Sequence, residues 1–367
     1  MTSAVAALAL GLAACGGGVE QKAAAADLPQ DFFGVVAPEL LPAEQSELRQ
    51  ALDAQSKAGV DLIRQPFRWN EIEPKKGAYN FELYDRLVGR AADAGITILP
   101  IVFGVPKREA SKKKKGVRVT ATTTMPPKSN ARFAKYAAKL VQRYGTTGTF
   151  WAENPTVTKR PITEWQIWNE PNLPPYWGGK PDAKAYAKLL TVTAAAVRKA
   201  DPSARVLTGG MPESKIGVPL KTFVRQLAKA AGPGSYDVLA VHPYAKTAAG
   251  VIAGAEAAQK AATINGKKPA IWITECGWAT GRLGSDFTVS EKKQAELIAE
   301  LVRLSAAKAD ALNLQGVVYY AWRDVPPYPG GKDFWGLHTG MVRKNNTVKP
   351  SLTAYASAVK TARGAES

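Results

Sequence analysis

The feature that most constrains this chain is a regular alternation of short apolar runs with longer stretches of helical periodicity. Eight short runs follow one another along the chain, and each leaves room for a helix after it. We expect strands over residues 33–36, 61–65, 96–103, 162–168, 205–208, 238–241, 270–274 and 317–321. Strict alternation of strand and helix favours a parallel sheet that is covered by helices.

The stretches between these runs carry apolar side chains at helical spacing. The clearest helical face consists of Phe133, Tyr136, Ala137, Leu140, Val141 and Tyr144. These positions fall at i, i+3, i+4, i+7, i+8 and i+11, which is one side of a helix. Another helix carries Leu48 and Leu52 one turn apart, and a last helix is expected around residues 354–359.

Eight strand–helix units are the count of a (β/α)8 TIM barrel, so we predict one α/β domain over residues 31–362. The alternative, an open doubly wound sheet, carries a glycine-rich phosphate-binding turn after its first strand. Here that turn reads Ala37-Pro38-Glu39, which has no glycine to cradle a phosphate. The sequence therefore favours the barrel.

The first residues of the chain are typical of an export signal. Residues 4–14 form a short apolar run that leads into Cys15 and three glycines, and this resembles a bacterial lipoprotein box, although residues 1–3 lack Lys and Arg. We therefore expect a signal segment over residues 1–15, a lipidated Cys15 that tethers the protein to the outer face of a membrane, and a flexible spacer over residues 16–30. The alternative is an ordinary alanine-rich tail.

The net charge of +18 raises the question of nucleic acid. The densest basic run is Lys112–Lys115, in the stretch after the third strand, and neither zinc-finger spacing nor a helix-turn-helix pattern accompanies it. An exported protein also meets no genomic target, so we expect no nucleic-acid partner. We expect an anionic cell-surface polymer or lipid headgroups to contact this run. The alternative is a solvated loop.

Metal and cofactor sites find little support in the composition. The chain has two histidines, His242 and His338, and two cysteines, Cys15 and Cys276, without the spacing of a metal site. We expect no metal and no cofactor, and we expect Cys276 to be a small core residue that faces the helix layer. The oligomeric state is not readable from the sequence.

In a barrel, the residues at the carboxyl ends of the strands converge on one mouth. Those ends carry Arg64, Asn169, Glu170, His242, Tyr244, Glu275 and Trp322. Strands four and seven lie roughly across the barrel from each other, so Glu170 and Glu275 can face a sugar between them. Glycoside hydrolysis needs two such carboxyl groups, one to protonate the leaving oxygen and one to meet the developing cation at the anomeric carbon.

The motifs at these strand ends resemble those of clan A of the glycoside hydrolases. Residues 168–172 read WNEPN after the fourth strand, and residues 274–278 read TECGW after the seventh. Within the clan, the chain is similar to the β-xylosidase/α-iduronidase family and to the cellulase-type families. Further matching segments are RQPFRW at 64–69, EP at 73–74, GAYNF at 77–81, FWGL at 334–337 and KP at 349–350. The resemblance extends over residues 32–359.

The resemblance implies a retaining mechanism with a role for each matched residue. Glu170 is expected to be the general acid and base, and Glu275 the nucleophile. Asn169 is expected to bind the sugar 2-hydroxyl, and Arg64 to hold Glu275 ionised. A cation beside Glu275 and none beside Glu170 would separate their pKa values, and the carboxyl groups of a retaining enzyme lie about 5–5.5 Å apart.

Other residues are expected to bind the substrate. His242 and Tyr244 would hydrogen-bond the nucleophile or the sugar, and Trp322 would form an apolar platform beneath the ring. Trp69 and Trp177 are candidates for stacking on sugars, with a place in the core as the alternative for each. The expected substrate is an extracellular poly- or oligosaccharide with β-linkages. The rival interpretations are a non-catalytic carbohydrate-binding protein on the same barrel and a transglycosylase that uses the same residues.

Overall fold

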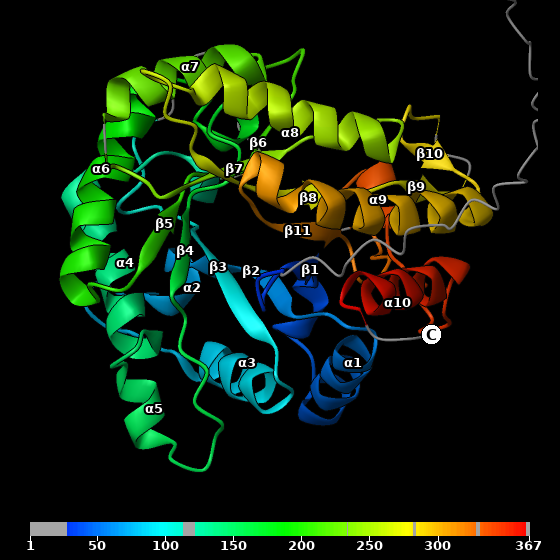
Figure 1. Ribbon diagram of the computed structural model, residues 1–367. Coiled ribbons are helices and arrows are strands. Elements are labelled where there is room, and N and C mark those ends of the chain that lie inside the picture. Colours follow the sequence, from blue (N-terminus) through cyan, green and yellow to red (C-terminus); the bar gives the residue numbers. More distant parts are fainter. Residues whose placement is uncertain (1–27, 113–121, 233, 282–283, 328–330, 365–367) are drawn as a thin grey trace, which may run out of the picture.

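A computed structural model describes residues 28–112, 122–232, 234–281, 284–327 and 331–364. Its centre is a barrel of eight parallel strands, each followed by a helix (Figure 1). The barrel strands are β1 (Phe33–Val36), β2 (Leu62–Arg68), β3 (Thr97–Phe103), β4 (Glu164–Ile167), β5 (Arg205–Leu207), β7 (Val238–His242), β8 (Ala270–Cys276) and β11 (Leu314–Tyr320). Three shorter strands are β6 (Met211–Pro212), β9 (Ala279–Thr280) and β10 (Thr288–Val289).

The strands close into a ring. β1 pairs with β2 on one side and with β11 on the other, so that Val36 lies beside both Arg64 and Tyr320. A pairing of Leu207 with Val238 joins β5 to β7 and completes the circle. The predicted (β/α)8 barrel is therefore confirmed.

An outer layer of helices surrounds the barrel (Figure 1). The main helices are α1 (Gln45–Lys57), α3 (Glu82–Asp93), α4 (Asn130–Tyr144), α6 (Ala183–Ala200), α7 (Leu220–Ala231), α8 (Ala248–Ala262), α9 (Glu291–Leu312) and α10 (Pro350–Ala362). Two short helices, α2 (Trp69–Ile72) and α5 (Thr149–Glu153), and the 3-10 turns η1 (Pro38–Leu40), η2 (Thr122–Thr124), η3 (Pro174–Tyr176) and η4 (Trp335–His338) complete the fold. Side chains cap several helices: Ser129 accepts a hydrogen bond from the backbone N–H of Arg132, and Asp182 accepts one from that of Lys184.

The core has two layers, as the geometry of a barrel requires. The inner layer fills the barrel with Val36, Leu62, Leu99, Leu207, Val238, Ala240, Trp272, Val318 and Ala321. The larger outer layer lies between strands and helices, and the predicted face of α4 is buried in it. Cys276 also belongs to the outer layer, which confirms its prediction as a core residue.

Some boundaries differ from the expected ones. β4 ends at Ile167 rather than Trp168, because Trp168 adopts a φ of +77° that an extended strand does not allow. The short strands β6, β9 and β10 have no counterpart in the expected set because they hold two residues each. Cys15 and most of the predicted spacer lie outside the described residues. Among the described helices, none has the length and apolar character that crossing a membrane requires.

Candidate active site

One arginine connects side chains from three strands at the mouth of the barrel through hydrogen bonds. Arg64 of β2 is 1% exposed, and its guanidinium donates to three side chains. Nη1 lies 2.5 Å from Oε1 of Glu275, Nη2 lies 2.7 Å from Oδ1 of Asn169, and Nε lies 2.7 Å from Oε1 of Gln166. The planar fork of a guanidinium suits such a fixed set of acceptors. The side chains at the ends of β4 and β8 are therefore held at one place by β2.

Gln166 was not among the predicted site residues. It is buried in β4, where it accepts from Arg64 and donates from Nε2 to the backbone oxygen of Thr208 and to Oγ1 of Thr274. The sequence does hold a signal for it. A glutamine inside a strand that is apolar on both faces must find buried partners, because an unpaired buried amide is costly.

His242 and Tyr244 follow β7 into the same site. His242 is buried, and its Nδ1 lies 3.0 Å from Oε1 of Glu170 and 3.6 Å from Oε2 of Glu275. The hydroxyl of Tyr244 donates to Oε2 of Glu275 over 2.9 Å. A Cβ atom at Gly210 would lie 1.9 Å from Nε2 of His242, so only glycine leaves room for this imidazole. The predicted convergence of these side chains is what the structure shows.

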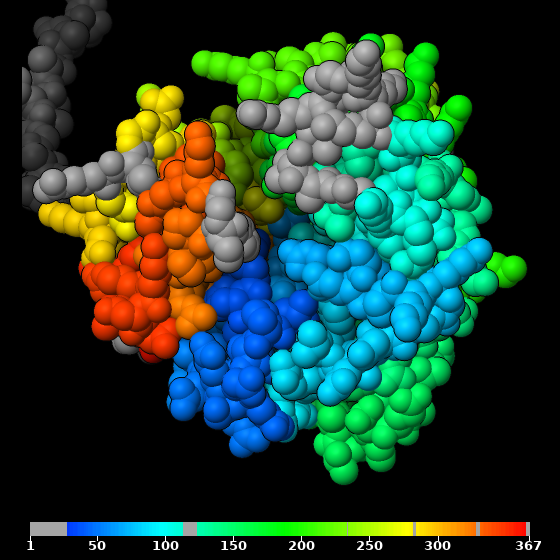
Figure 2. Space-filling view, turned by 180° about the vertical axis from the view of Figure 1, so that it is seen from behind, coloured from blue at the N-terminus to red at the C-terminus, as the bar shows by residue number. Residues whose placement is uncertain are grey.

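The two carboxyl groups are close enough to share one anomeric carbon. A carboxylate oxygen of Glu170 lies within 4.8 Å of one of Glu275, and both side chains are 12% exposed. Retaining glycosidases hold their carboxyl groups about 5–5.5 Å apart, whereas inverting enzymes need about 6.5–9.5 Å for an intervening water. The spacing therefore fits the retaining geometry. The space-filling view shows a hollow near the middle of one face of the molecule, between the blue segments near the N-terminus and the orange segment after β11 (Figure 2).

The surroundings drive the pKa values of the two carboxyl groups apart. Burial raises the pKa of Glu170 above its usual value, and the hydrogen bond with His242 offsets only part of this rise. Burial acts in the same direction on Glu275, but attraction to His242 and Arg64 and hydrogen bonds from Tyr244 and Arg64 outweigh it and lower its pKa. One group is thus prepared to hold a proton and the other to stay ionised, as an acid and a nucleophile require.

Backbone strain marks the segment that presents Glu170. Trp168 and Glu170 have φ values of +77° and +47°, in the left-handed region that residues with a side chain rarely adopt. The backbone N–H of Glu170 donates to the oxygen of Gly210, and Nδ2 of Asn172 donates to the oxygens of Pro212 and Val218. Such strain persists where neighbouring contacts fix the chain, and it is typical of functional sites.

The prediction that Trp322 forms a platform beneath a sugar held at the two acids is wrong. Trp322 is 4% exposed and packs in the outer core layer, against the helices rather than toward the mouth. The strand alternation that would bring it inward ends with β11 at Tyr320, and after that point Ala321 packs in the inner layer. Tyr320 instead lies at the end of β11 and contacts the inner layer.

The stacking role predicted for Trp69 is wrong as well, and that for Trp177 stays a prediction. Trp69 is 0% exposed, donates from Nε1 to Glu73 and stacks on Tyr136 with ring centroids 5.4 Å apart. It begins α2 rather than ending a strand, and this turn carries it into the outer core. Trp177 is 5% exposed and packs edge-to-face against Trp168. Trp69 therefore offers no face to a ligand, whereas Trp177 lines a pocket beside Lys112.

Aromatic rings also gather beside the nucleophile, and the sequence did not predict that they come together. The ring of Trp335 lies 5.1 Å from that of Tyr244 and 4.9 Å from that of Phe287. Because Tyr244 contacts Glu275, these rings form an apolar wall close to the nucleophile. They come from three separate loops, so no local sequence pattern brings them together.

Glu170, His242 and Glu275 also have the composition of a metal site, since one ligand atom from each lies within 4.8 Å of the others. The charges around them favour proton chemistry instead. Arg64 places a permanent positive charge 2.5 Å from Glu275, and Tyr244 donates to the other oxygen of the same carboxylate. A cation would have to displace both contacts, so this donor set does not fit a metal ion.

Comparison with solved structures shows the same fold in several glycosidases, all below 25% identity. A family 39 glycoside hydrolase from Bacteroides cellulosilyticus WH2 matches with a TM-score of 0.66 and 21% identity over 90% of this chain and 64% of that protein. A monomeric β-xylosidase from Caulobacter crescentus CB15 matches with a TM-score of 0.61 and 19% identity, over 89% and 67%. The exo-β-1,4-mannosidase Op5Man5 from an Opitutaceae bacterium matches with 0.60 and 16%, over 91% and 60%. This chain therefore spans about two thirds of the length of these proteins.

A family model described as glycosyl hydrolases family 39 matches residues 34–267. The matched segment includes Arg64, Asn169, Glu170 and His242, and it ends before β8 and Glu275. It covers well over half of the sequence, and the suspected relation to the β-xylosidase type of glycosidase is thereby confirmed. The chain belongs to glycosyl hydrolases family 39.

Proposed function

We propose that this protein is a retaining glycoside hydrolase that cleaves β-linked poly- or oligosaccharides, with Glu275 as the nucleophile and Glu170 as the acid and base. One observation carries the proposal: the two carboxyl groups lie within 4.8 Å of each other, and their pKa values are shifted in opposite directions. Membership of family 39 and the β-glycosidases of the same fold support it.

The proposed reaction has two steps. In the first, the ionised carboxylate of Glu275 forms a bond to the anomeric carbon while the glycosidic C–O bond breaks and Glu170 gives its proton to the leaving oxygen. In the second, Glu170 takes a proton from water, the water oxygen bonds to the anomeric carbon, and the ester to Glu275 breaks. Two inversions at one carbon give net retention.

The neighbours of the two acids have separate tasks in this scheme. Arg64 and Tyr244 donate to the two oxygens of Glu275 and keep it ionised before attack. The Oδ1 atom of Asn169 is occupied by Arg64, so its NH2 group is the part that can donate to the sugar 2-hydroxyl.

Substitution of each acid tests the proposal. We expect Glu275→Gln to lower kcat on aryl β-glycosides by more than about 10⁴-fold, since no covalent intermediate can form. Glu170→Gln should cost about 10²–10⁴-fold on substrates with poor leaving groups and much less on activated aryl glycosides. Glu164→Gln is a matched control, because Glu164 begins the strand that Glu170 follows and pairs with Arg205 at the opposite end of the barrel. Full activity of Glu170→Gln on a natural glycan would contradict the assignment.

Two rivals use the same site. A transglycosylase would transfer the sugar from Glu275 to an added acceptor sugar rather than to water, so product analysis with and without acceptor separates the two reactions. A non-catalytic carbohydrate-binding protein would bind glycans without turnover under any condition. The opposite pKa shifts favour an enzyme, because binding alone does not need one protonated and one ionised carboxyl group.

The proposed site of action is the outer face of a bacterial membrane, with residues 1–15 as the signal segment, Cys15 as the lipid anchor, residues 16–30 as the spacer and 31–362 as the catalytic domain. The apolar run before Cys15 supports this proposal. Cys15→Ser should release the protein from the membrane fraction into the soluble fraction. Unchanged membrane attachment would argue against the anchor.

The proposed anionic partner also rests on charge. Lys112, the first residue of the Lys112–Lys115 run, lines a pocket of 530 Å³ with Lys180 and Lys184 on the rim that follows β3 and β4; the other three lysines of the run lie outside the described residues. An acidic polymer held there should bind less tightly as salt rises, because exposed charges are screened within about 8 Å at physiological ionic strength. Lys180→Gln together with Lys184→Gln should weaken binding to an acidic polysaccharide but not to a neutral one. Binding that is independent of salt would contradict this partner.

A further inference from the structure

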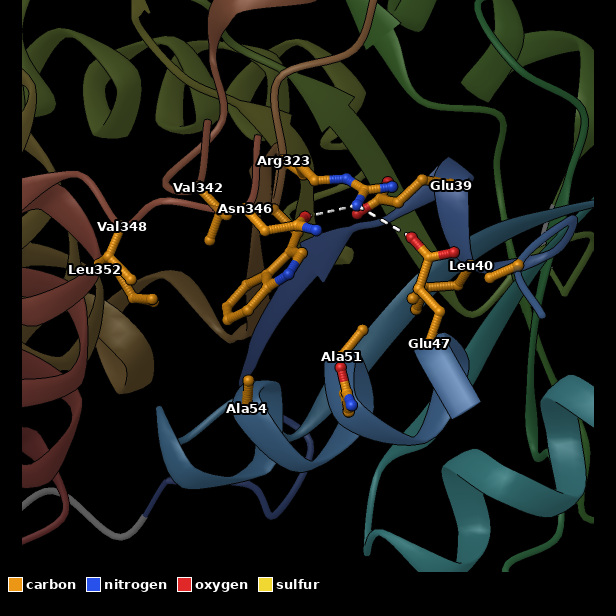
Figure 3. A pocket seen from close by; sticks show the side chains of 13 residues that line it. Glu39, Leu40, Glu47, Ala51, Ala54, Arg323, Val342, Asn346, Val348 and Leu352 are labelled. Atoms are coloured by element: carbon orange, nitrogen blue, oxygen red, sulfur yellow. Dashed lines mark hydrogen bonds and ion pairs between the residues drawn. The ribbon is translucent and has the colours of Figure 1, made fainter. Parts of the chain in front are cut away.

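A second pocket lies between the outer helices, apart from the two catalytic candidates (Figure 3). Its volume is 190 Å³, and its walls are the turn after β1, one side of α1 from Glu47 to Ala54, the segment between β11 and α10, and the start of α10. The lining residues are Glu39, Leu40, Ala43, Glu47, Gln50, Ala51, Ala54, Trp322, Arg323, Val342, Asn346, Val348 and Leu352. Neither Glu170 nor Glu275 is among them.

One side of the pocket is apolar. Trp322 lines it together with small and aliphatic side chains, among them Ala51, Ala54 and Leu352. Val348 at its edge is 53% exposed, which is unusual for a large aliphatic side chain in this protein. Trp322 is 4% exposed, so only a small part of its indole reaches the pocket, beside the alanines of α1. Together these groups form one apolar wall, which suits a ring with one apolar face.

The other side of the pocket is polar and partly occupied. Arg323 bridges the wall: its Nη1 donates to Oε1 of Glu47 over 3.2 Å and to Oδ1 of Asn346 over 2.7 Å (Figure 3). The amide NH2 groups of Gln50 and Asn346 add donors, because Oδ1 of Asn346 is the atom that Arg323 holds. Hydrogen-bond donors and acceptors therefore line the same small pocket.

Glu39 stands out among these polar groups. Both of its carboxylate oxygens are buried, and neither has a hydrogen-bond partner in another described residue. Burial raises the pKa of Glu39 to about 7, and neither a hydrogen bond from its own backbone N–H nor the attraction of Arg323 compensates. A buried carboxyl group with so few partners is costly, and a donor supplied by a ligand would reduce that cost.

We infer that this pocket is a second carbohydrate-binding site, which holds a single pyranose unit of a polysaccharide outside the catalytic centre. The apolar face of the pyranose packs on the alanines of α1, on Leu352 and on the exposed edge of Trp322, and its hydroxyl groups donate to Glu39 and accept from Asn346 and Gln50. The inference rests on the proposed function for the choice of a glycan as ligand. A hydroxyl donor to a carboxylate makes a charge-assisted hydrogen bond, which is stronger than a neutral one.

Size and charge exclude other ligands. Drug-sized ligands occupy pockets of about 300–1,000 Å³, so a pocket of 190 Å³ holds one ring rather than an oligosaccharide. Glu39 and Glu47 disfavour an anion. A metal ion would need more than one free carboxylate, and Glu47 is already paired with Arg323. The segments that build the pocket follow the carboxyl ends of β1 and β11, so it lies toward the same end of the barrel as Glu170 and Glu275.

Two substitutions test the site in the full-length protein. Ala54→Phe fills the pocket from α1, and Glu39→Gln removes the buried charge at nearly constant shape. Ser46→Phe is the matched control, because Ser46 is an exposed residue of the same helix that does not line the pocket. The probes are soluble xylan, mannan and mixed-linkage β-glucan in affinity gels, and methyl β-xyloside and methyl β-mannoside in calorimetry.

The expected result is a split between binding and catalysis. Ala54→Phe should weaken retention by at least one of the polysaccharides about tenfold or more, Glu39→Gln several-fold, and Ser46→Phe not at all. All three should keep the wild-type kcat and KM on a small aryl β-glycoside, which also shows that they are folded. Equal retention of Ala54→Phe and Ser46→Phe on every polymer would overturn the inference. So would a pocket that binds glucosamine but no neutral glycoside, since that ligand is a cation. A wild-type protein that binds polymer through the pocket but hydrolyses nothing would refute the proposed function and leave this site standing.

Discussion

The buried carboxyl groups at the mouth of the barrel and in the outer pocket differ in their partners and in their pKa values. At the mouth, Glu275 is surrounded by donors and its pKa falls in spite of burial, whereas Glu170 has one histidine and its pKa rises. In the outer pocket, Glu39 has no partner in another described residue and its pKa rises to about 7. Burial is common to all three groups, so the number and charge of the partners decide which carboxyl group stays ionised.

Removal of the main partner at the mouth should have the largest effect. Arg64→Met leaves Gln166, Asn169 and Glu275 without their donor, and the loss of a buried ion pair partner typically costs about 3–5 kcal/mol of unfolding free energy. Activity should fall at least about 10³-fold. The acid limb of the pH–rate profile should move to higher pH, because the pKa of Glu275 rises when the cation is lost. Kinetics from pH 4 to 8 and thermal unfolding measure both effects.

Removal of a positive charge that contacts neither acid is the control for Arg64→Met. Lys293 pairs with Glu296 on α9, and the two side chains are 53% and 50% exposed. Lys293→Met should cost no more than about 1 kcal/mol, as is usual for exposed pairs, and should leave the pH–rate profile in place. If Arg64→Met kept the wild-type acid limb, Arg64 would not be what lowers the pKa of Glu275.

Crowding of the histidine that bridges the two acids should have the next largest effect. Gly210→Ala places a methyl group 1.9 Å from the present position of Nε2 of His242, so the ring must leave the position in which its Nδ1 contacts Glu170. Overpacking of this kind costs about 1–3 kcal/mol, and a displaced catalytic neighbour can cost about 10²-fold in rate. Gly284→Ala is the control, since a Cβ atom there would meet nothing within 4 Å. Equal activity of the two variants would show that His242 has no positioning role.

The positions around Glu170 and Glu275 also show how far sequence reasoning reaches. The strand-end rule brought Arg64, Asn169, His242 and both acids to one mouth because parallel strands in a barrel end at the same side. It failed for Trp322, because the alternation of inward and outward side chains holds only while the chain remains a strand, and β11 ends two residues earlier. A regular pattern predicts position only within the regular element.

Other residues escaped prediction for a different reason. Gly210 matters only because His242, from the next barrel strand, occupies the space above it. The aromatic wall of Tyr244, Phe287 and Trp335 is assembled from three loops, and loop conformation has no period that a sequence reveals. Trp69 shows the converse, because an indole is as well suited to a core as to a sugar and the sequence alone does not distinguish the two.

A smaller change at the mouth separates the effect of a hydrogen bond from that of a charge. Tyr244→Phe removes only the 2.9 Å hydrogen bond to Oε2 of Glu275 and leaves Arg64 in place. A hydrogen bond to a charged group is worth about 1.5–3 kcal/mol, so we expect kcat/KM to fall by about 10- to 100-fold. The acid limb of the pH–rate profile should move to higher pH by less than it does in Arg64→Met. A larger shift than in Arg64→Met would mean that the hydroxyl, rather than the guanidinium, keeps Glu275 ionised.

The smallest expected effect is at Glu39, where the substitution should stabilise the protein instead of destabilising it. Below pH 4.5 both folded and unfolded chains hold the proton; between 4.5 and about 7 only the folded chain does, so unfolding free energy falls as pH rises. Glu39→Gln removes this loss and should be the more stable protein at pH 8 by about 1–2 kcal/mol, with no advantage at pH 4. Asp201→Asn is the contrasting control. Burial acts to raise the pKa of Asp201, but hydrogen bonds from Ser203 and Thr146 outweigh it and lower the pKa, so this variant should lose stability at pH 7 and lose less at low pH. Parallel stability curves for wild type and Glu39→Gln would show that Glu39 is already satisfied, and the contrast with Glu275 would fail.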